Sequence, residues 1–468
     1  MSIRQLTEAL ESGALTAVDV TNHALEQIDR LDPDIGAMVL VCADRARSEA
    51  AEIDRRRAGG EQLGVLAGVP IAIKDLEDVA GLPTRFGSAV FRDAQPALAD
   101  ATPVQVFRSA GAVVIGKTNL SEFATEGFTA NLTQPPTRNP WNLDMSPGGS
   151  SGGSAAAIVA GMVPIATATD GGGSVRIPAS LCGLLGLKPT FGAIGRYPAH
   201  DWIDISSSGP LATSVDDLDL LFGLQRGYLS GDPDTAPGAG DVRGAGPKRI
   251  VATDRLSGET PLPEEVRLLF RDAVETVART YELDVTWHDP GAIFQGHDPI
   301  RDWRTLATAE HVNALNREFV AEHLDNMHLS AQQFLSYGLG VSVDEYISAR
   351  RRRFAYVHIL DELVRDAVLL TPTISIAGWL ADGRVALEDA PGLLPSHAIS
   401  TNIQNLTGHP ALSLPCGMTT RGTPFGIQAT MSRHHDQDLI DFARVWEQAH
   451  PWPTVADGYE PFTSALNI

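Results

Sequence analysis

The segment Ser146–Ser180 reads SPGGSSGGSAAAIVAGMVPIATATDGGGSVRIPAS and says most about how this chain folds. It carries two serine-bearing glycine loops, GGSSGG with Ser150 and DGGGS with Ser174. Between them the pattern predicts a helix of small residues over 154–160 and a buried strand over 164–169. Glycine has no Cβ, so both loops can bring bare backbone N–H groups against a reacting group. Serine needs a base to attack a carbonyl, and N–H donors must stabilise the oxyanion that forms. The two loops therefore predict acyl transfer.

Strands and helices alternate outward from this segment, which predicts an α/β fold with crossover connections. The expected helices cover 3–12, 17–30, 43–57, 102–110, 264–281, 399–406 and 437–448, and 301–366 is largely helical. The expected strands cover 69–73, 112–115, 249–253, 283–287, 368–373, 411–415 and 425–430. Thr16 is the expected N-cap of the second helix, because Asp19 follows three residues later. We predict the fold class α/β, with a mixed central β-sheet covered by helices.

The chain is expected to form one domain, 1–468, in five parts. A Gly/Pro/Asp-rich composition predicts an exposed linker over 226–248. Before the linker we expect peripheral N-terminal helices over 1–65 and a catalytic core over 66–225. After it we expect a helical, lid-bearing part over 249–366 and a C-terminal return to the core sheet over 367–468. The helical segment near 300–366 is expected to border the substrate entrance.

Composition narrows the class of protein. Asp and Glu outnumber Lys and Arg by 58 to 36, a net charge of −22, which disfavours nucleic acid as a partner because its binding depends on basic residues. No apolar run has the length of a membrane span and the N-terminus lacks a signal-peptide pattern, so no membrane partner is expected and the cytoplasm is the expected location. Three scattered cysteines, Cys42, Cys182 and Cys416, are expected to be buried free thiols rather than disulfides or metal ligands.

Two glycine motifs match known patterns by letter but not by context. Residues 111–118, GAVVIGKT, have the spacing of a phosphate-binding P-loop, but AVVI predicts a strand and leaves no loop of free N–H groups. Residues 148–152 have the G-x-S-x-G pattern of a nucleophile elbow, but the preceding NPWNLDMSP is not the buried strand that this motif needs. Flexible linkers are disfavoured as well, because both glycine loops adjoin buried apolar segments.

Lys74 is the candidate base for the serines. It ends the apolar stretch PIAIKD, where burial removes solvation and makes the neutral amine accessible near neutral pH. No histidine lies near either loop in the sequence, and the polar surroundings of His434 and His435 favour solvation over metal binding. From this segment alone, an ion pair of Lys74 with Asp75 or Asp78 is the alternative.

Several of these strings together resemble the amidase signature family of serine hydrolases. The strings that carry the resemblance are GVPIAIKD (68–75), KTNLSEFA (117–124), RNPWN (138–142), SPGGSSGGSAAA (146–157), TDGGGSVRIPAS (169–180), CGLLGLKPTFG (182–192), NLTGHPALSLPCG (405–417) and PFGIQ (424–428). They follow one another in the family's order and cover nearly the whole chain, which makes a chance match very improbable compared with one motif alone. The resemblance implies no metal and no organic cofactor. Homodimers are common among relatives, and the sequence leaves the oligomeric state open.

The resemblance also implies a role for each residue of the glycine loops. Ser174 is the implied nucleophile, Ser150 a bridging serine preceded by a cis peptide bond, and Lys74 the base that takes the proton of Ser150. The implied oxyanion hole comprises the backbone N–H groups of Gly171, Gly172, Gly173 and Ser174, and the implied supports are Ser151, Asp170 and Arg176. Gly171 departs from the family, which commonly has a larger residue such as Thr or Ile there. This departure predicts a more pliable loop or a roomier pocket.

The substrate-binding candidates lie outside the two glycine loops, and one of them, Ile177, follows Ser174 by three residues. They are Glu126, Gly127, Phe128, Ile177 and Trp202, the last within the stretch 200–205. Phe128, Ile177 and Trp202 favour an apolar or aromatic group. Glu126 and Asp204 either orient an amine or face water.

The implied function is hydrolysis of the carbon–nitrogen amide bond of a small, apolar or aromatic substrate, through an acyl-enzyme on Ser174. Carbamate (urethane) and ester hydrolysis share the tetrahedral intermediate and stay open as alternatives. A third alternative is the glutamine-hydrolysing subunit of a tRNA-dependent amidotransferase, but Ile177 stands where that branch usually has Gln, and a charge of −22 suits tRNA poorly. A non-catalytic scaffold would be expected to lack Lys74, Ser150 or Ser174, and the chain has all three.

Overall fold

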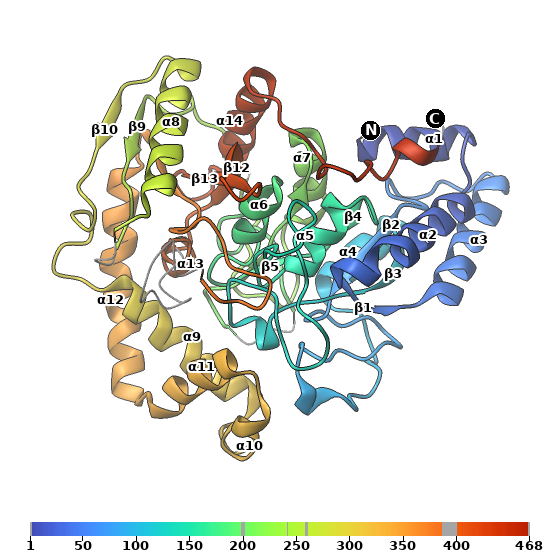
Figure 1. Ribbon diagram of the computed structural model, residues 1–468, viewed down its shortest axis with the longest axis horizontal. Helices are drawn as coiled ribbons and strands as arrows, with labels where there is room; N and C mark the ends of the chain where they lie inside the picture. Colours follow the sequence, from blue (N-terminus) through green and yellow to red (C-terminus); the bar gives the residue numbers. More distant parts are fainter. Residues whose placement is uncertain (1, 198–201, 241, 258–260, 386–399, 467–468) are drawn as a thin grey trace.

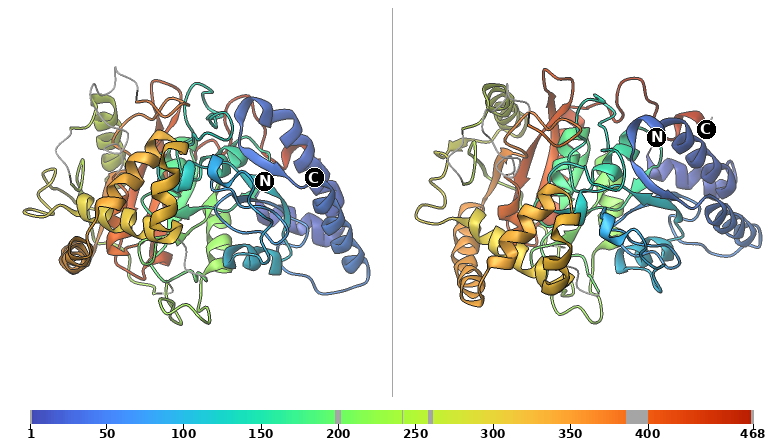
Figure 2. Two further views of the ribbon diagram at one scale, coloured as in Figure 1. Left: turned by 90° about the horizontal axis from the view of Figure 1, so that it is seen from below. Right: turned by 60° about the horizontal axis from the view of Figure 1, so that its bottom comes forward.

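The computed structural model describes residues 2–197, 202–240, 242–257, 261–385 and 400–466 (Figures 1 and 2). The first part of the chain forms α1 (Ile3–Ser12), α2 (Ala17–Ile35), β1 (Met38–Val41) and α3 (Ala43–Ala58). The next part forms β2 (Pro70–Lys74), α4 (Thr102–Ser109), β3 (Val113–Thr118), α5 (Gly152–Val159), β4 (Ile165–Ala166), β5 (Thr169–Asp170), α6 (Arg176–Cys182), β6 (Leu185–Lys188), β7 (Ser207–Ser208), β8 (Leu211–Ala212) and α7 (Val215–Gln225).

The second half continues the alternation of strand and helix, with a block of helices inserted. It forms β9 (Arg249–Ala252), α8 (Glu264–Tyr281), β10 (Val285–Trp287), α9 (Pro299–Leu315), α10 (Arg317–His323), α11 (Leu329–Gly340), α12 (Val343–Leu363), β11 (Ala367–Pro372), α13 (Asn402–Thr407), β12 (Ala411–Met418), β13 (Pro424–Thr430) and α14 (Asp436–Ala449). Short 3-10 turns cover Ala89–Phe91, Glu122–Ala124, Leu324–Asn326 and Ser464–Leu466. Within the described residues, no helix is both long enough and apolar enough to cross a membrane.

Among the described residues, the strands pair in three groups. The largest sheet has the order β10-β9-β11-β13-β12-β6-β8 and is mixed, because β9 runs parallel to β10 and β11 whereas the other pairs are antiparallel. A second sheet has the order β1-β3-β2-β4, with β2 parallel to both neighbours. The short strands β5 and β7 form an antiparallel pair. The predicted class, α/β with a mixed central sheet covered by helices, is confirmed.

The second sheet explains how a lysine comes to be buried. All five residues of β2 are buried, since β3 and β4 flank the strand on both edges. Lys74, its last residue, is therefore carried into the interior, as the string PIAIKD predicts. In GAVVIGKT, residues Val113–Thr118 form the buried strand β3 rather than a loop, which confirms that its P-loop spacing is a chance match.

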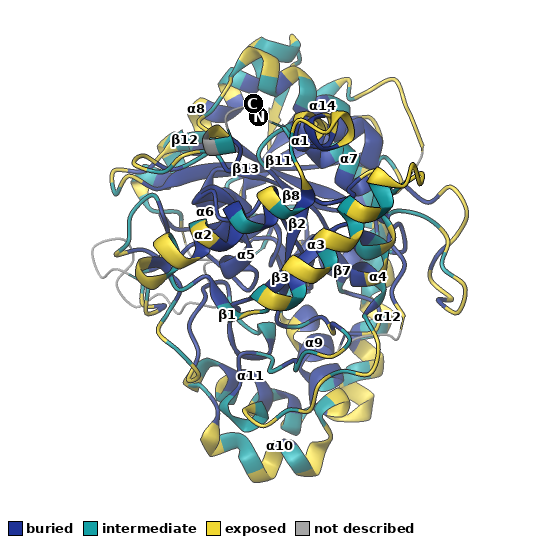
Figure 3. Cartoon of the chain, turned by 90° about the vertical axis from the view of Figure 1, so that its right-hand side faces the viewer, coloured by how far each residue is buried: buried dark blue, intermediate teal, exposed yellow. Residues whose placement is uncertain are grey.

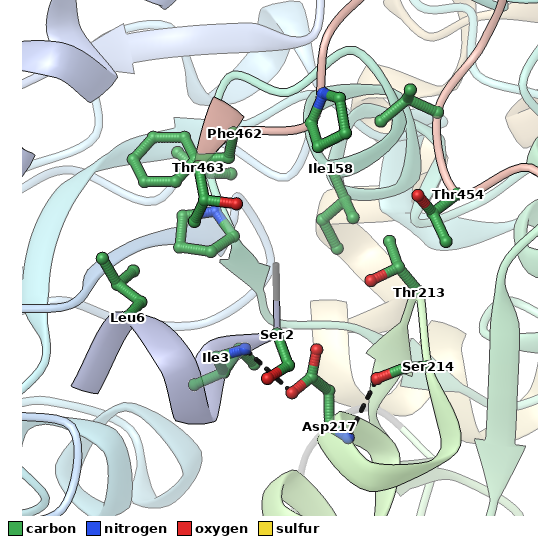
Figure 4. A pocket seen from close by; sticks show the side chains of 14 residues that line it. Ser2, Ile3, Leu6, Ile158, Thr213, Ser214, Asp217, Thr454, Phe462 and Thr463 are labelled. Atoms are coloured by element: carbon green, nitrogen blue, oxygen red, sulfur yellow. Dashed lines mark hydrogen bonds between the residues drawn. The ribbon is translucent and has the colours of Figure 1, made fainter. Parts of the chain in front are cut away.

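Helices α1–α3 form one side of the molecule, and both chain ends lie there (Figure 1). The predicted cap of α2 is confirmed: Thr16 Oγ1 accepts the Asp19 N–H at 3.0 Å, and Asp19 Oδ2 accepts the Thr16 N–H at 3.2 Å. The Ile3 N–H donates to Asp217 Oδ1 at 2.9 Å and so joins α1 to the first turn of α7 (Figure 4). A cavity of about 150 Å³ lies beside this contact, but none of the predicted site residues lines it.

Two expected segments differ from the prediction in detail. The strand expected over 164–169 is split into β4 and β5, and β5 pairs with β7 instead of joining the sheet of β4. The described part of 226–248 contains no helix and no strand, as a linker should, but it is not exposed throughout. Asp232, Thr235 and Ala239 are buried, and Asp232 Oδ2 accepts the N–H of Arg196 at 2.8 Å. The segment therefore packs against the core, because a polar side chain of the segment, that of Asp232, binds the backbone of a neighbouring loop.

Helices α9–α12 pack together around a second hydrophobic cluster, which also includes Val251 of β9 and Leu369 of β11. The cluster also contains Phe123 and Trp202 from the 66–225 part of the chain. Figure 3 shows α10 as the outermost of these helices, with many exposed residues, whereas the described parts of α9 beneath it are largely buried. The helical part therefore covers the core through α9.

Candidate active site

Lys74 makes three hydrogen bonds to hydroxyl groups of the two loops that the sequence singles out. Its Nζ lies 2.7 Å from Ser150 Oγ, 2.8 Å from Ser151 Oγ and 2.8 Å from Thr169 Oγ1. The main-chain N–H of Lys74 donates to Thr167 Oγ1 at 2.9 Å, which ties the end of β2 to the residues that follow β4. The structure thus joins Lys74 and Ser150, which are far apart in sequence. The alternative ion pairs of Lys74 are not formed within the described residues: Asp75 pairs with Lys117 at 2.9 Å, and Asp78 Oδ1 accepts from Thr84 Oγ1 at 2.6 Å.

Burial makes the amine of Lys74 easy to deprotonate. The side chain is fully buried, and loss of solvation lowers the pKa of Lys74 from 10.5 to about 7, although the negative charges of Glu77 and Asp170 act in the opposite direction. Burial also raises the pKa of the Glu77 carboxyl to about 7. A neutral amine keeps two N–H donors and gains one lone pair. With three hydroxyls around it, neutral Lys74 can donate two hydrogen bonds and accept one.

The bond between Gly149 and Ser150 is a cis peptide, as the resemblance implies. Gly149 is also required by space, since a Cβ there would lie 2.5 Å from the carbonyl oxygen of Phe128. Ser150 and Ser151 are both fully buried. Ser151 Oγ lies 3.4 Å from the carbonyl oxygen of Thr169, so this hydroxyl can donate to the carbonyl while it accepts from Lys74.

Ser174 follows β5 and precedes α6, and it is slightly more exposed than Ser150. Both serines line the same small cavity, of about 20 Å³. The other lining residues are Leu76, Phe123, Ala124, Thr169, Gly171, Trp202, Ser206 and His311. A water molecule occupies roughly this much space, so the cavity in this conformation is far smaller than an amide substrate. The two loops therefore meet where a reacting carbonyl would have to bind.

The backbone after Asp170 presents N–H groups beside Ser174. Within the part of the chain that the structure describes, the N–H groups of Gly171, Gly172 and Ser174 have no hydrogen-bond acceptor. The N–H of Gly173 differs, because it donates to Asp170 Oδ1 at 2.7 Å. The expected oxyanion donors thus change at one position: Gly173 is engaged by its own loop, and Gly171, Gly172 and Ser174 remain as candidates.

Two side chains hold the carbonyl groups of this loop from outside. Trp303 Nε1 on α9 donates to the Gly171 carbonyl at 2.8 Å, and Thr401 Oγ1 donates to the Gly172 carbonyl. A trans peptide unit is planar and directs its C=O and N–H to opposite sides. A bound Gly171 carbonyl therefore fixes the direction of the Gly172 N–H. No side chain fits at Gly172, where a Cβ would lie 2.6 Å from the Trp303 ring.

The expected support by Asp170 and Arg176 takes the form of a fully buried ion pair. Arg176 Nη2 lies 2.7 Å from Asp170 Oδ1, and Arg176 Nε lies 2.9 Å from Oδ2. Burial alone would raise the pKa of Asp170, but the charge and hydrogen bonds of Arg176, together with Asn405, lower it to about 2. Arg176 also donates to Asn405 Oδ1 at 2.7 Å and to Gln428 Oε1 at 2.6 Å. The pair thereby connects the Ser174 loop to α13 and β13.

The structure divides the substrate-binding candidates. Trp202 lines the cavity, whereas Glu126, Gly127, Phe128 and Ile177 are absent from its described walls. Phe128 and Ile177 pack instead in a hydrophobic cluster with Trp379. Glu126 is half-buried, and burial raises the pKa of its carboxyl to about 7. Their roles as substrate contacts stay predictions.

Asp204 neither faces water nor is free to orient an amine. It is buried, and its Oδ2 lies 2.6 Å from Arg350 Nη2 and 2.6 Å from Arg353 Nη1 of α12. This carboxylate joins the loop of Trp202 to the helical part. His200, at the start of the expected 200–205 stretch, lies outside the described residues.

Sequence reasoning missed several residues that complete the site. Three of them, Thr169, Asn405 and Gln428, lie in strings that carry the family resemblance, but no local feature of the sequence indicates which groups they bind. Trp303 and His311 come from α9, in the segment that is expected to border the substrate entrance but in which the sequence predicts no site residue. The signal available in the sequence is that the buried face of α9 carries both aromatic and polar residues, which is unusual for a helix that only covers a core. Within the described residues, no group of His, Cys, Asp and Glu is arranged to hold a metal ion.

The comparisons with known proteins agree with this geometry. The family model described as Amidase matches residues 19–440. One component of the glutamyl-tRNA(Gln) amidotransferase of Cyanothece sp. is 31% identical, over 96% of this chain and 98% of its own. A candidate amidase of Mycobacterium bovis, AmiB2, is 34% identical over 95% of each chain.

Solved structures are similar over the same length. A bacterial aryl acylamidase of the amidase signature family superposes with a TM-score of 0.85 at 26% identity, covering 97% of this chain and 96% of that one. The substrate complex of 6-aminohexanoate cyclic dimer hydrolase superposes with a TM-score of 0.83 at 28% identity, covering 97% of each chain. The chain therefore belongs to the amidase signature family, and it is a hydrolase of carbon–nitrogen bonds.

Proposed function

We propose that the protein hydrolyses the amide bond of a small apolar or aromatic substrate through an acyl-enzyme on Ser174. One observation carries the proposal: Lys74 Nζ lies 2.7 Å from Ser150 Oγ, and Ser150 shares its cavity with Ser174. A buried amine, a bridging hydroxyl and a partly accessible hydroxyl supply a base, a proton relay and a nucleophile in one place.

The relay begins with neutral Lys74. Its lone pair accepts the Ser150 Oγ proton, while its two N–H groups donate to Ser151 Oγ and Thr169 Oγ1. Ser150 Oγ takes the proton of Ser174 Oγ as that oxygen bonds to the substrate carbonyl carbon. A protonated Lys74 would donate to all three hydroxyls and could accept nothing. The relay therefore requires the lowered pKa that burial gives this lysine.

The oxyanion of the tetrahedral intermediate needs donors that are already in place. The amides of Gly171, Gly172 and Ser174 supply them, and the N-terminal end of α6 adds its favourable dipole. Collapse of the intermediate breaks the carbon–nitrogen bond as Ser150 returns a proton to the leaving nitrogen. Water then attacks the acyl-Ser174 ester, Ser150 and Lys74 take its proton, and the carboxylic acid leaves with Ser174 restored.

The cavity walls favour an apolar substrate. Leu76, Phe123, Ala124 and Trp202 supply apolar surface, and the described lining includes no Lys, Arg, Asp or Glu side chain. The similarity to a bacterial aryl acylamidase agrees with an aromatic group beside the amide. Esters and carbamates pass through the same tetrahedral intermediate, so activity on both is expected to accompany amide cleavage.

Glutamine hydrolysis within a tRNA-dependent amidotransferase is the second candidate, favoured by the 31% identity to a component of such an enzyme. Glutamine carries an ammonium and a carboxylate, and the described walls of the cavity offer neither of the opposite charges. We therefore place this candidate second. Glutamine turnover that exceeds aryl and aliphatic amide turnover would reverse the order.

A fluorophosphonate–rhodamine probe tests the proposal directly. The purified chain should be labelled on Ser174, and Ser174→Ala should not be labelled. Turnover of an aliphatic amide, an aryl amide, a carbamate and glutamine then ranks the substrates. A folded protein that neither reacts with the probe nor cleaves any member of this panel would overturn the proposal.

A further inference from the structure

We infer that the indole of Trp202 sets the size of the substrate pocket over Ser174, and that it does so because residue 171 is glycine. The inference rests on the proposed function and names a residue that selects substrates. It starts from a mismatch of volume: the cavity at Ser174 measures about 20 Å³, which no amide fits. The space directly beside Ser174 therefore admits an amide only if one of the described walls gives way.

Trp202 occupies the space of a side chain that position 171 lacks. A Cβ built on Gly171 would lie 1.9 Å from both Cε3 and Cζ3 of the Trp202 ring. Real Cβ atoms do not approach ring carbons so closely, so the ring can lie against the loop only because its backbone is bare. The indole is buried and is the largest side chain that lines the cavity.

The backbone of Trp202 is held firmly. Its carbonyl accepts from Arg196 Nη1 at 3.0 Å, and the N–H of the next residue, Ile203, donates to Glu310 Oε2 at 2.7 Å. The chain on this side of the cavity is thus bonded to both the core and α9. Displacement of the segment as a whole would break these hydrogen bonds.

The indole itself is held by contacts alone. Its Nε1 is buried and has no hydrogen-bond partner among the residues that the structure describes. Trp303 lies edge-on at 6.1 Å between ring centroids and His311 at 5.8 Å. Trp303 differs from Trp202 in that its own Nε1 is bound to the Gly171 carbonyl. Rotation of the Trp202 side chain therefore breaks no hydrogen bond within the described residues, and among the apolar walls this largest side chain frees the most space when it moves.

The consequence is a pocket whose depth depends on this one side chain. A small acyl group needs a small displacement of the indole, and a bulky one needs the indole to leave Gly171 altogether. Replacement of Trp202 by a small residue removes that requirement and leaves the volume of the indole ring to the substrate. The kcat/KM for bulky substrates should rise far more in that variant than the kcat/KM for small ones.

Amides of graded size test the inference. The ratio of kcat/KM for 1-naphthylacetamide to that for acetamide should rise at least about tenfold in Trp202→Ala. Trp287→Ala, a half-exposed tryptophan on β10, is the matched control and should leave the ratio unchanged. Should Trp202→Ala fail to fold, Trp202→Leu tests the same direction with a smaller change. A ratio that stays constant or falls in the folded variant overturns the inference.

A packing measurement tests the pair without activity. Gly171→Ala should lower the melting temperature in the wild-type background, because the new Cβ meets the Trp202 ring, and should not lower it further in the Trp202→Ala background. Equal losses in both backgrounds overturn the inference. Failure of the proposed function is recognised separately: absence of fluorophosphonate labelling at Ser174 removes both, whereas normal labelling with an unchanged size ratio removes this inference alone.

Discussion

The segment around Lys74 and the segment around Trp202 are held in place by different forces. Lys74 Nζ has three hydroxyl partners within 2.8 Å, and nearby Arg176 is saturated by side chains of three elements. Among the residues that the structure describes, the indole of Trp202 has ring and apolar contacts but no hydrogen bond. Directional bonds fix Lys74 and the ion pair of the Ser174 loop, whereas apolar contact leaves the substrate wall adjustable. The chemistry should therefore be sensitive to single polar changes, and the specificity to changes of volume.

Among changes to the reacting groups, removal of the nucleophile Ser174 should have the largest effect. Ser174→Ala should lower amide turnover by at least about 10⁴-fold, because it removes the oxygen on which the proposed acyl-enzyme forms. The measurement is turnover of an aryl amide at saturating substrate. Ser206→Ala, a hydroxyl that lines the same cavity, is the matched control and should lose far less. Comparable losses in the two variants would contradict the role of Ser174.

Replacement of the base comes next. Lys74→Met keeps the volume but removes the lone pair, and should lower turnover by about 10²- to 10⁴-fold. Lys188→Met is the matched control: Lys188 is equally buried with a pKa lowered to about 7, but its Nζ donates to the Pro189 carbonyl instead of to a serine. If Lys74→Met kept near-full activity, a histidine base would have to be sought, and His311 at the cavity would be the first to test.

The buried ion pair should dominate stability. Arg176→Met leaves the Asp170 carboxylate buried without its cation and should lower the free energy of unfolding by about 3–5 kcal/mol, measured by urea denaturation. Arg249→Met breaks the partly exposed pair with Asp366 and should cost no more than about 1 kcal/mol. A smaller loss in Arg176→Met than in Arg249→Met would show that burial does not strengthen this pair.

The smallest effect is expected where the two segments meet, at Trp303. Trp303→Phe keeps a ring over Gly172 but loses the hydrogen bond to the Gly171 carbonyl. We expect kcat to fall by about tenfold with little change in KM, since the Gly172 N–H is less well aligned with the oxyanion. Trp287→Phe is the control. A rise of KM with kcat unchanged would instead place Trp303 in substrate binding.

The difference between the two segments also explains what could be predicted from the sequence. Lys74, Ser150 and Ser174 stand in strings whose glycines and apolar flanks are local signals, and the α/β alternation is local as well. The contact of Trp202 with Gly171 depends on how a loop and α9 pack over the core, and no periodicity reports it. The hydrogen bond of the Gly173 N–H escapes prediction for the same reason. Whether a loop amide is free depends on the side-chain geometry of Asp170 three residues earlier.

The state of Lys74 is most open to test through pH. Burial lowers the pKa of Lys74 to about 7. The fraction of neutral Lys74 therefore rises with pH and reaches one half near pH 7. The ionised form of Glu77, whose own pKa burial raises to about 7, raises the pKa of Lys74, so Glu77→Gln should shift the profile to lower pH. Glu77→Gln therefore distinguishes titration of this lysine from titration of the substrate or the probe.

The decisive measurement is the rate constant for fluorophosphonate labelling of Ser174 between pH 5 and 9, in wild type and Glu77→Gln. A rate that rises with a midpoint near pH 7 and then levels, with an earlier rise in Glu77→Gln, is the result expected of an uncharged Lys74 acting through Ser150. A rate that is constant or falls over this range, in protein that stays folded, would contradict it.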